Sequence, residues 1–182
     1  LPATLITRLV NELARHINVS LLDEFTIEAN PEDVTPQWVK TIKSLGITRV
    51  SMGIQSFNDN ELRIINRRHS AQQALHAIKI LRENGIERIS GDLIYGLPGQ
   101  DLKSWKSSLN QLLSFRLPHF SAYLLSYEQG TGLYSRLMAG KVEEASEELV
   151  NEMYMHLIDT ARSHGYNHYE ISNFAMPGSK AI

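Results

Sequence analysis

Five polar residues lie where a small ligand could bind: Glu28, Gln55, Arg67, Asp92 and Ser126. Four of them stand near the carboxyl ends of predicted strands, and Arg67 follows in the segment after Gln55. Carboxylates suit an ammonium group or ribose hydroxyls, and a guanidinium pairs with a carboxylate. The set could therefore bind a small zwitterion that also carries hydroxyls. The spacing equally allows a structural role in which Glu28 and Asp92 cap helices or pair with arginines.

Other polar motifs are weaker evidence for a site. The run Tyr95–Gly99 (YGLPG) could approach a phosphate or a purine, but a tight turn is the better interpretation. The run Arg67-Arg68-His69 could bind phosphate, although three basic residues usually form a solvated helix end. The sequence contains no nucleophile elbow, P-loop or Rossmann fingerprint.

The elements that must position these residues alternate between helix and strand. A glycine repeatedly ends a helix, and one apolar residue then leads into a strand, as in Leu45-Gly46-Ile47 and Asn84-Gly85-Ile86. Such alternation predicts a parallel sheet with right-handed crossovers, either an open sheet or a barrel. A short helix is expected to carry Arg67 and Arg68, and the tail from Met176 to be loop. The first helix is predicted by the apolar spacing of Leu5, Leu9, Val10, Leu13 and Ile17. Further helices are expected over 35–44, 70–84, 101–115 and 143–163. Strands are expected over 24–29, 48–55, 87–95, 119–126 and 167–172.

The predicted strands have one apolar and one small or polar face. In the strand at 48–55, Val50, Met52 and Ile54 alternate with Ser51, Gly53 and Gln55. Strands buried on both faces usually read as continuous apolar runs. We therefore expect the apolar residues to pack outward on helices and the other face to be wet or filled by a ligand, at the carboxyl ends of the strands.

The composition limits the class of protein. The chain has 182 residues, of which 42% are hydrophobic and 21% charged, and a net charge of −2, as in a soluble globular protein with no general attraction to nucleic acid. No apolar run approaches the roughly 20 residues of a transmembrane helix. The chain has no cysteine, so it holds neither a disulfide nor a thiolate-bound metal, which fits a cytoplasmic protein.

Four motifs give the sequence a resemblance to a known family: EFTIEANP, VSMGIQSFND…INRRH, GDLIYGLPGQ and HYEISNFA. Over residues 22–176 they resemble the radical S-adenosylmethionine family of oxygen-independent coproporphyrinogen III oxidases and their heme-chaperone relatives. The resemblance implies a partial (β/α) barrel with parallel strands and helices outside, followed by a C-terminal domain. It also implies S-adenosylmethionine and a [4Fe-4S] cluster as cofactors, and a porphyrinogen or heme as substrate or cargo.

The family resemblance assigns a role to each of the five polar residues. Glu28 is similar to the carboxylate that holds the methionyl ammonium group, and Arg67 to the arginine that pairs with the methionyl carboxylate. Gln55 and Asp92 resemble the ligands of the ribose hydroxyls, and Ser126 resembles a backbone contact to the adenine.

Two departures from the family pattern change what this chain is expected to do. The CxxxCxxC run that holds the cluster and the GGGTP segment beside it are both absent. We therefore expect an internal fragment, with the first barrel strands missing, residues 1–166 in the barrel and 167–182 starting the C-terminal region. Such a fragment is expected to be inactive as an oxidoreductase and to expose a sheet edge through which it could dimerise.

The segments SAYLLSYEQGTGLYSRL and HYEISNFA resemble the heme-chaperone branch more than the true oxidase, which oxidatively decarboxylates porphyrinogen propionates. A non-redox module that binds a nucleoside or an amino acid is the other alternative.

Overall fold

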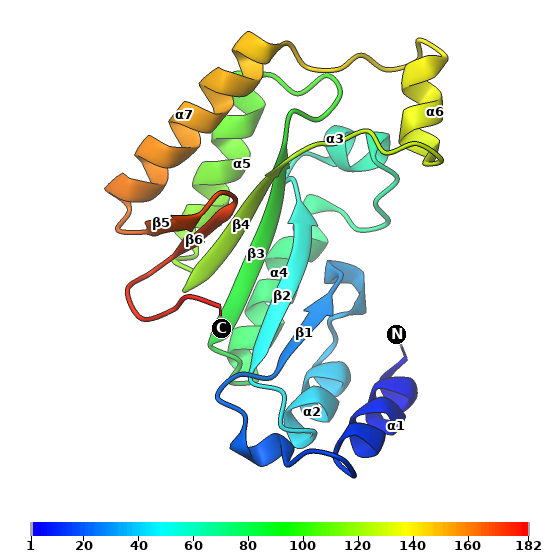
Figure 1. Ribbon diagram of the computed structural model, residues 1–182, viewed down its shortest axis with the longest axis vertical. Coiled ribbons are helices and arrows are strands. Elements are labelled where there is room, and N and C mark those ends of the chain that lie inside the picture. The colour runs from blue at the N-terminus through cyan, green and yellow to red at the C-terminus, as the bar shows by residue number, and fades with distance from the viewer. Residues whose placement is uncertain (1, 182) are drawn as a thin grey trace.

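The computed structural model describes residues 2–181 and contains one six-stranded sheet in the order β1-β2-β3-β4-β6-β5. Strands β1 to β4 are parallel, whereas β6 pairs antiparallel with both β4 and β5. The sheet does not close on itself, so the expected α/β fold with a partial barrel is confirmed (Figure 1). The strands are β1 Thr26–Ala29, β2 Arg49–Gln55, β3 Arg88–Tyr95, β4 His119–Leu124, β5 Asn167–Glu170 and β6 Asn173–Ala175.

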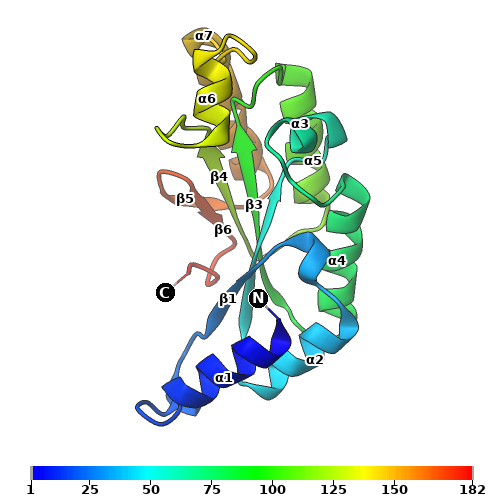
Figure 2. The same cartoon turned by 90° about the vertical axis from the view of Figure 1, so that its right-hand side faces the viewer.

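Helices cover one side of this sheet, where α2, α4 and α5 lie to the right of the strands in Figure 2. Their starts follow the sequence signals: the Thr35 hydroxyl accepts from the Trp38 amide, Ser70 and Gln73 form a capping box, and Asp101 caps α5. The helices are α1 Ala3–Leu13, α2 Pro36–Ser44, α3 Asp59–Ile64, α4 Ala71–Glu83, α5 Leu102–Ser114, α6 Gly132–Met138 and α7 Glu147–Ser163, with short 3₁₀ turns η1 Val19–Leu21 and η2 Pro31–Asp33.

The apolar strand face packs against these helices as expected. Val50, Met52 and Ile54 of β2 are completely buried, and so are Ile89 and Leu93 of β3. The parallel register aligns Val50 with Ile89, so that these side chains form one continuous apolar layer beneath the helices.

The first predicted helix is present as α1. It buries Ile6 and Val10, while Leu5, Leu9, Leu13 and, beyond its end, Ile17 are at least 40% exposed. One helix expectation was wrong. Arg67 and Arg68 do not lie on a helix. Helix α3 ends at Ile64, and Asn66 adopts a left-handed backbone with φ of 56°, which asparagine tolerates better than most residues.

Two elements were missed in the sequence. Helix α6 occupies residues 132–138, where the sequence indicated only a loop from Glu128 to Gly132. The last predicted strand, 167–172, is β5 followed by a tight turn into β6, because the Glu170 carboxylate accepts from the Ser172 amide and the Asn173 side-chain amide. As a result, the final strands join the sheet antiparallel.

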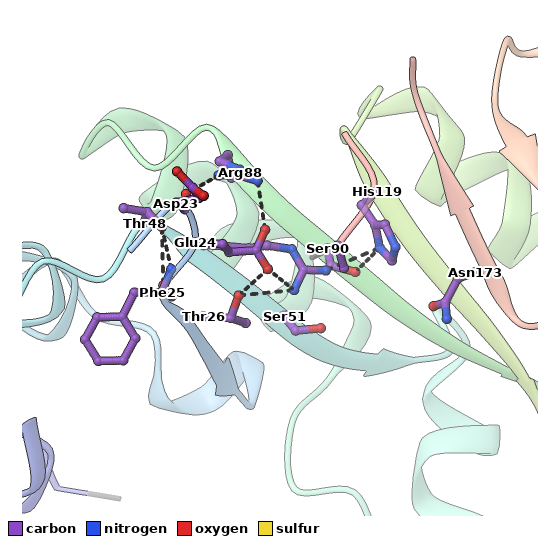
Figure 3. Close-up of polar contacts among 12 residues, drawn as sticks. Asp23, Glu24, Phe25, Thr26, Thr48, Ser51, Arg88, Ser90, His119 and Asn173 are labelled. Carbon is purple, nitrogen blue, oxygen red and sulfur yellow. Dashed lines mark hydrogen bonds and ion pairs between the residues drawn. The ribbon is translucent and has the colours of Figure 1, made fainter. Parts of the chain in front are cut away.

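Polar side chains on the opposite face of the sheet form a network near the amino ends of the strands (Figure 3). Glu24 lies 2.8 Å from the Arg88 guanidinium and 3.8 Å from that of Arg49, which is only 8% exposed. The Arg49 guanidinium extends to His119 Nδ1 at 3.4 Å, and the Ser90 hydroxyl is 2.7 Å from the same nitrogen. These contacts connect the segment before β1 to β2, β3 and β4 through side chains.

The network fixes the protonation of His119. Arg49 can only donate, so Nδ1 is the acceptor and Nε2 carries the hydrogen that it donates to the Tyr169 hydroxyl at 2.8 Å. Burial lowers the pKa of His119 from 6.5 to about 4; the positive charge of Arg49 adds to this effect and Glu24 opposes it. His119 is therefore neutral at physiological pH.

No helix within residues 2–181 is long and apolar enough to cross a membrane.

Substituting Gly91 should destabilise the fold. A Cβ at Gly91 would lie 2.7 Å from Leu112 Cδ1 and 3.1 Å from both Ile54 Cδ1 and Leu117 Cδ1. We expect Gly91→Ala to lower the free energy of unfolding by about 1–3 kcal/mol through overpacking, measured by urea denaturation. Gly132→Ala is the matched control, since its Cβ would meet no atom within 4 Å and alanine favours the helix. A Gly91→Ala protein as stable as the wild type would contradict the packing described above.

The buried His119 should make stability depend on pH. The unfolded chain takes up a proton on this residue near pH 6.5 and the folded protein only near pH 4, so the free energy of unfolding falls as the pH drops through that window. We expect the wild type to lose up to about 3 kcal/mol more than His119→Asn between pH 7 and pH 4.

Urea denaturation at a series of pH values measures this difference. His76→Asn, which alters an exposed histidine on α4, is the control and should follow the wild type. Identical pH dependence in His119→Asn and wild type would show that His119 is not buried in the neutral form.

Candidate functional site

A cleft of about 520 Å³ lies at the carboxyl ends of β1, β2 and β3, within the ~300–1,000 Å³ range typical of small-molecule sites. Glu28, Gln55, Arg67 and Asp92 all line it, so the structure brings together four of the five residues selected from the sequence. Other residues that line the cleft include Ile6, Asn30, Asp33, Trp38, Ser51, Gly53, Ile94 and Tyr123.

Gln55 ends β2 in an unusual backbone conformation. Its φ is 66°, the left-handed region that residues other than glycine seldom adopt, and the β2–β3 register shifts between Gly53 and Gln55. The side chain then folds back over Gly53, where an added Cβ would lie 2.7 Å from Gln55 Nε2 and 3.7 Å from Arg67 Nη2. Gly53 therefore leaves room for the Gln55 amide and the Arg67 guanidinium, which both lie close to its backbone. Strained backbone of this kind concentrates at functional sites.

Arg67 brings a half-buried positive charge to the cleft. Its Nη1 donates to Asn30 Oδ1 at 3.1 Å, and Asn30 follows directly after β1. Burial lowers the pKa of Arg67 below its ordinary value, while the negative charges of Glu32 and Asp92 oppose that shift. The guanidinium has five donors and makes one hydrogen bond to a side chain within residues 2–181, so it keeps donors for a ligand carboxylate.

The two carboxylates of the cleft differ in their surroundings. Asp92 accepts from the Ser51 hydroxyl at 3.0 Å, and burial raises its pKa, with Ser51, Ser121 and Arg49 opposing the shift and Glu28 adding to it. Glu28 is exposed, and its carboxylate has neither a hydrogen bond nor an ion pair with the residues described. The helix-capping and arginine-pairing roles considered for these residues are not what the structure shows. Glu28 is left available to a cationic ligand group.

Ser126 lies apart from the cleft. It follows the end of β4 in an exposed loop, where its hydroxyl donates to Glu128 at 3.0 Å. A backbone contact from Ser126 to a bound ligand stays a prediction.

Residues other than the five selected from the sequence also shape the cleft. Asn30 orients Arg67, Gly53 makes room for two side chains, and Tyr123 of β4 lines the cleft with 44% of its surface exposed. The position of Gly53, two residues before the polar residue Gln55 that ends the strand, could have predicted that this glycine makes room for side chains. Asn30 could be placed at the end of the first strand, but its contact with Arg67 had no local signal because the two residues are 37 positions apart in the chain.

The arrangement is suited to bind a ligand with a positive group, a carboxylate and hydroxyls. Glu28 can hold the positive group, Arg67 the carboxylate, and Gln55 with Asp92 the hydroxyls. Among residues 2–181, no group of three or more histidine, cysteine, aspartate or glutamate side chains could hold a metal ion.

Comparisons with known proteins place the chain in a family. The sequence model of the radical SAM superfamily matches residues 4–112. The heme chaperone HemW of Lactococcus lactis is 37% identical over 178 residues, which cover 98% of this chain and 47% of that protein. HemW of Bacillus subtilis is 39% identical over 160 residues, 88% of this chain and 42% of that protein.

The fold is similar to that of coproporphyrinogen III oxidase (HemN) from Escherichia coli, a radical SAM enzyme, with a TM-score of 0.85. That match has 23% sequence identity and covers 98% of this chain and 41% of the enzyme. The chain thus spans somewhat less than half the length of these relatives. Since the family model covers more than half of its residues and its fold agrees, the chain belongs to the radical SAM superfamily.

Proposed function

We propose that the cleft binds S-adenosylmethionine. One observation carries this proposal: Glu28, Gln55, Arg67 and Asp92, from four separate segments of the chain, line the same cleft. In the proposed complex Glu28 holds the methionyl ammonium group, Arg67 the methionyl carboxylate, and Gln55 and Asp92 the ribose hydroxyls. Bound in this way, S-adenosylmethionine supplies the sulfonium group from which the family generates a radical.

A [4Fe-4S] cluster does not fit the residues of this chain. Clusters of this kind are held by cysteine thiolates, and these 182 residues contain no cysteine. We propose that residues outside this chain hold the cluster, and we derive no chemical step through it. The role proposed for this chain is to bind and orient the cofactor.

We further propose that the whole protein handles heme as a chaperone. Support comes from relatives named heme chaperone HemW, which are 37% and 39% identical to this chain. The alternative, coproporphyrinogen oxidation, has the support of a shared fold at 23% identity.

Three sequence predictions accompany the proposal: a boundary between regions after residue 166, a cytoplasmic location, and dimerisation through an exposed sheet edge. Strand β1 is the last strand on one side of the sheet.

Removing the guanidinium of Arg67 should weaken cofactor binding. We expect Arg67→Ala to reduce the affinity for S-adenosylmethionine by about 1–3 kcal/mol, or roughly 5- to 150-fold, because a charge-assisted contact is lost. Isothermal titration calorimetry measures the change. Arg68→Ala is the matched control, since the Arg68 side chain is 78% exposed and pairs only at the surface with Glu32. Equal affinity of Arg67→Ala and wild type would remove Arg67 from the carboxylate site.

A heme titration of the whole protein distinguishes the two branches. The chaperone proposal predicts stoichiometric heme binding, seen as a shift of the Soret band, without turnover of coproporphyrinogen III under anaerobic reducing conditions. Decarboxylation of coproporphyrinogen III by the wild type would contradict the chaperone assignment and favour the oxidase.

A further inference from the structure

Two buried polar atoms have no hydrogen-bond partner within the described part of the chain: Glu32 Oε2 and His69 Nδ1. They lie 3.3 Å apart, the His69 side chain is fully buried, and the Glu32 side chain is 19% exposed. Unpaired buried groups are rare because each costs about 1–3 kcal/mol, so the pair requires an explanation.

The other nitrogen of His69 shows how the ring is protonated. Nε2 lies 3.0 Å from the carbonyl oxygen of Ile54, which can only accept, so Nε2 carries a hydrogen. A neutral ring would then turn the lone pair of Nδ1 toward the Glu32 carboxylate. A second ring proton replaces this repulsion by the attraction of opposite charges at the 3.3 Å between Nδ1 and Oε2. The geometry is that of a buried imidazolium–carboxylate ion pair.

The ion pair with Glu32 and the hydrogen bond to Ile54 together let His69 connect three segments that border the cleft. Glu32 belongs to η2, which follows β1; Ile54 precedes Gln55 at the end of β2; and His69 lies two residues after Arg67. Between these anchors the chain is irregular, because α3 ends at Ile64 and Asn66 has a positive φ. The Arg67 amide still donates to the Leu62 carbonyl at 2.9 Å. His69 is therefore the nearest buried anchor on the C-terminal side of Arg67.

We propose that Glu32 and His69 are positioning residues, whose buried ion pair holds the segment 66–69 so that the Arg67 guanidinium reaches the cleft. The inference deepens the proposed function, since the group being positioned is the one assigned to the methionyl carboxylate. Neither Glu32 nor His69 lines the cleft, so their effect on the ligand passes through Arg67.

The first test needs no substitution. In ¹⁵N-labelled wild-type protein at pH 7, the ring of His69 should show hydrogens on both nitrogens. In Glu32→Gln the ring should keep only the Nε2 hydrogen, because glutamine can donate to a neutral Nδ1 and still accept from Arg68. A single ring hydrogen on His69 in the wild type would overturn the ion pair.

The second test measures positioning. In Glu32→Ala we expect the Arg67 amide to exchange its hydrogen at least about tenfold faster, and the affinity for S-adenosylmethionine to fall about tenfold or more. Glu32→Gln should stay within about threefold of the wild type in both measurements, since its hydrogen bonds replace the ion pair. The matched control is Arg68→Ala, which removes the exposed partner of the same carboxylate and should also change little.

The outcomes separate this inference from the proposed function. Unchanged amide exchange at Arg67 in a folded Glu32→Ala protein would overturn the positioning role. If the wild type does not bind S-adenosylmethionine, the proposed function fails, while the ring spectrum and the amide exchange still decide the inference. Faster exchange with unchanged affinity would show that the ion pair orders the segment but does not position Arg67 for binding, which also overturns the inference.

Discussion

Buried polar side chains on the sheet face that is opposite to the helices need hydrogen-bond partners, because a buried donor or acceptor left unpaired costs about 1–3 kcal/mol. At the amino ends of the strands, Glu24, Arg49, Ser90 and His119 meet this requirement by contacting one another. The apolar residues on the other strand face are covered by helices in the usual way. The fold therefore depends on a sheet whose two faces are stabilised differently, one by apolar packing and one by side-chain hydrogen bonds and ion pairs.

On the same face, the polar side chains at the carboxyl ends of the strands make fewer hydrogen bonds and ion pairs. Glu28 has no partner in the described chain, and Arg67 makes one side-chain contact, to Asn30. The left-handed backbone of Gln55 and the missing Cβ of Gly53 leave room for both the Gln55 amide and the Arg67 guanidinium beside Gly53. The contrast between the paired side chains at the amino end and the free ligand-binding groups at the carboxyl end is the reason why we propose the cleft as the ligand site of a radical SAM protein.

Local signals in the sequence were sufficient for much of this architecture. Alternation predicted which residues of β2 are buried, and capping residues such as Thr35 and Ser70 marked where helices begin. Contacts between residues far apart in the sequence could not be predicted in the same way. The Arg49–His119 contact spans 70 positions and the Arg67–Asn30 contact 37, and neither has a local pattern. Tertiary packing likewise decides that α1 buries Ile6 and Val10 rather than Leu5 and Leu9, although apolar spacing predicted the helix itself.

The central claim is that one cleft binds S-adenosylmethionine through its methionine and ribose groups. An NMR titration of the ¹⁵N-labelled protein with S-adenosylmethionine tests it most directly, because it reports which residues the ligand reaches. The account predicts saturable shifts of the backbone amides of Glu28, Gln55 and Asp92 and of the Arg67 side chain, with the amino-end network around His119 unaffected. Saturable shifts confined to another surface, or none at millimolar ligand, would contradict it.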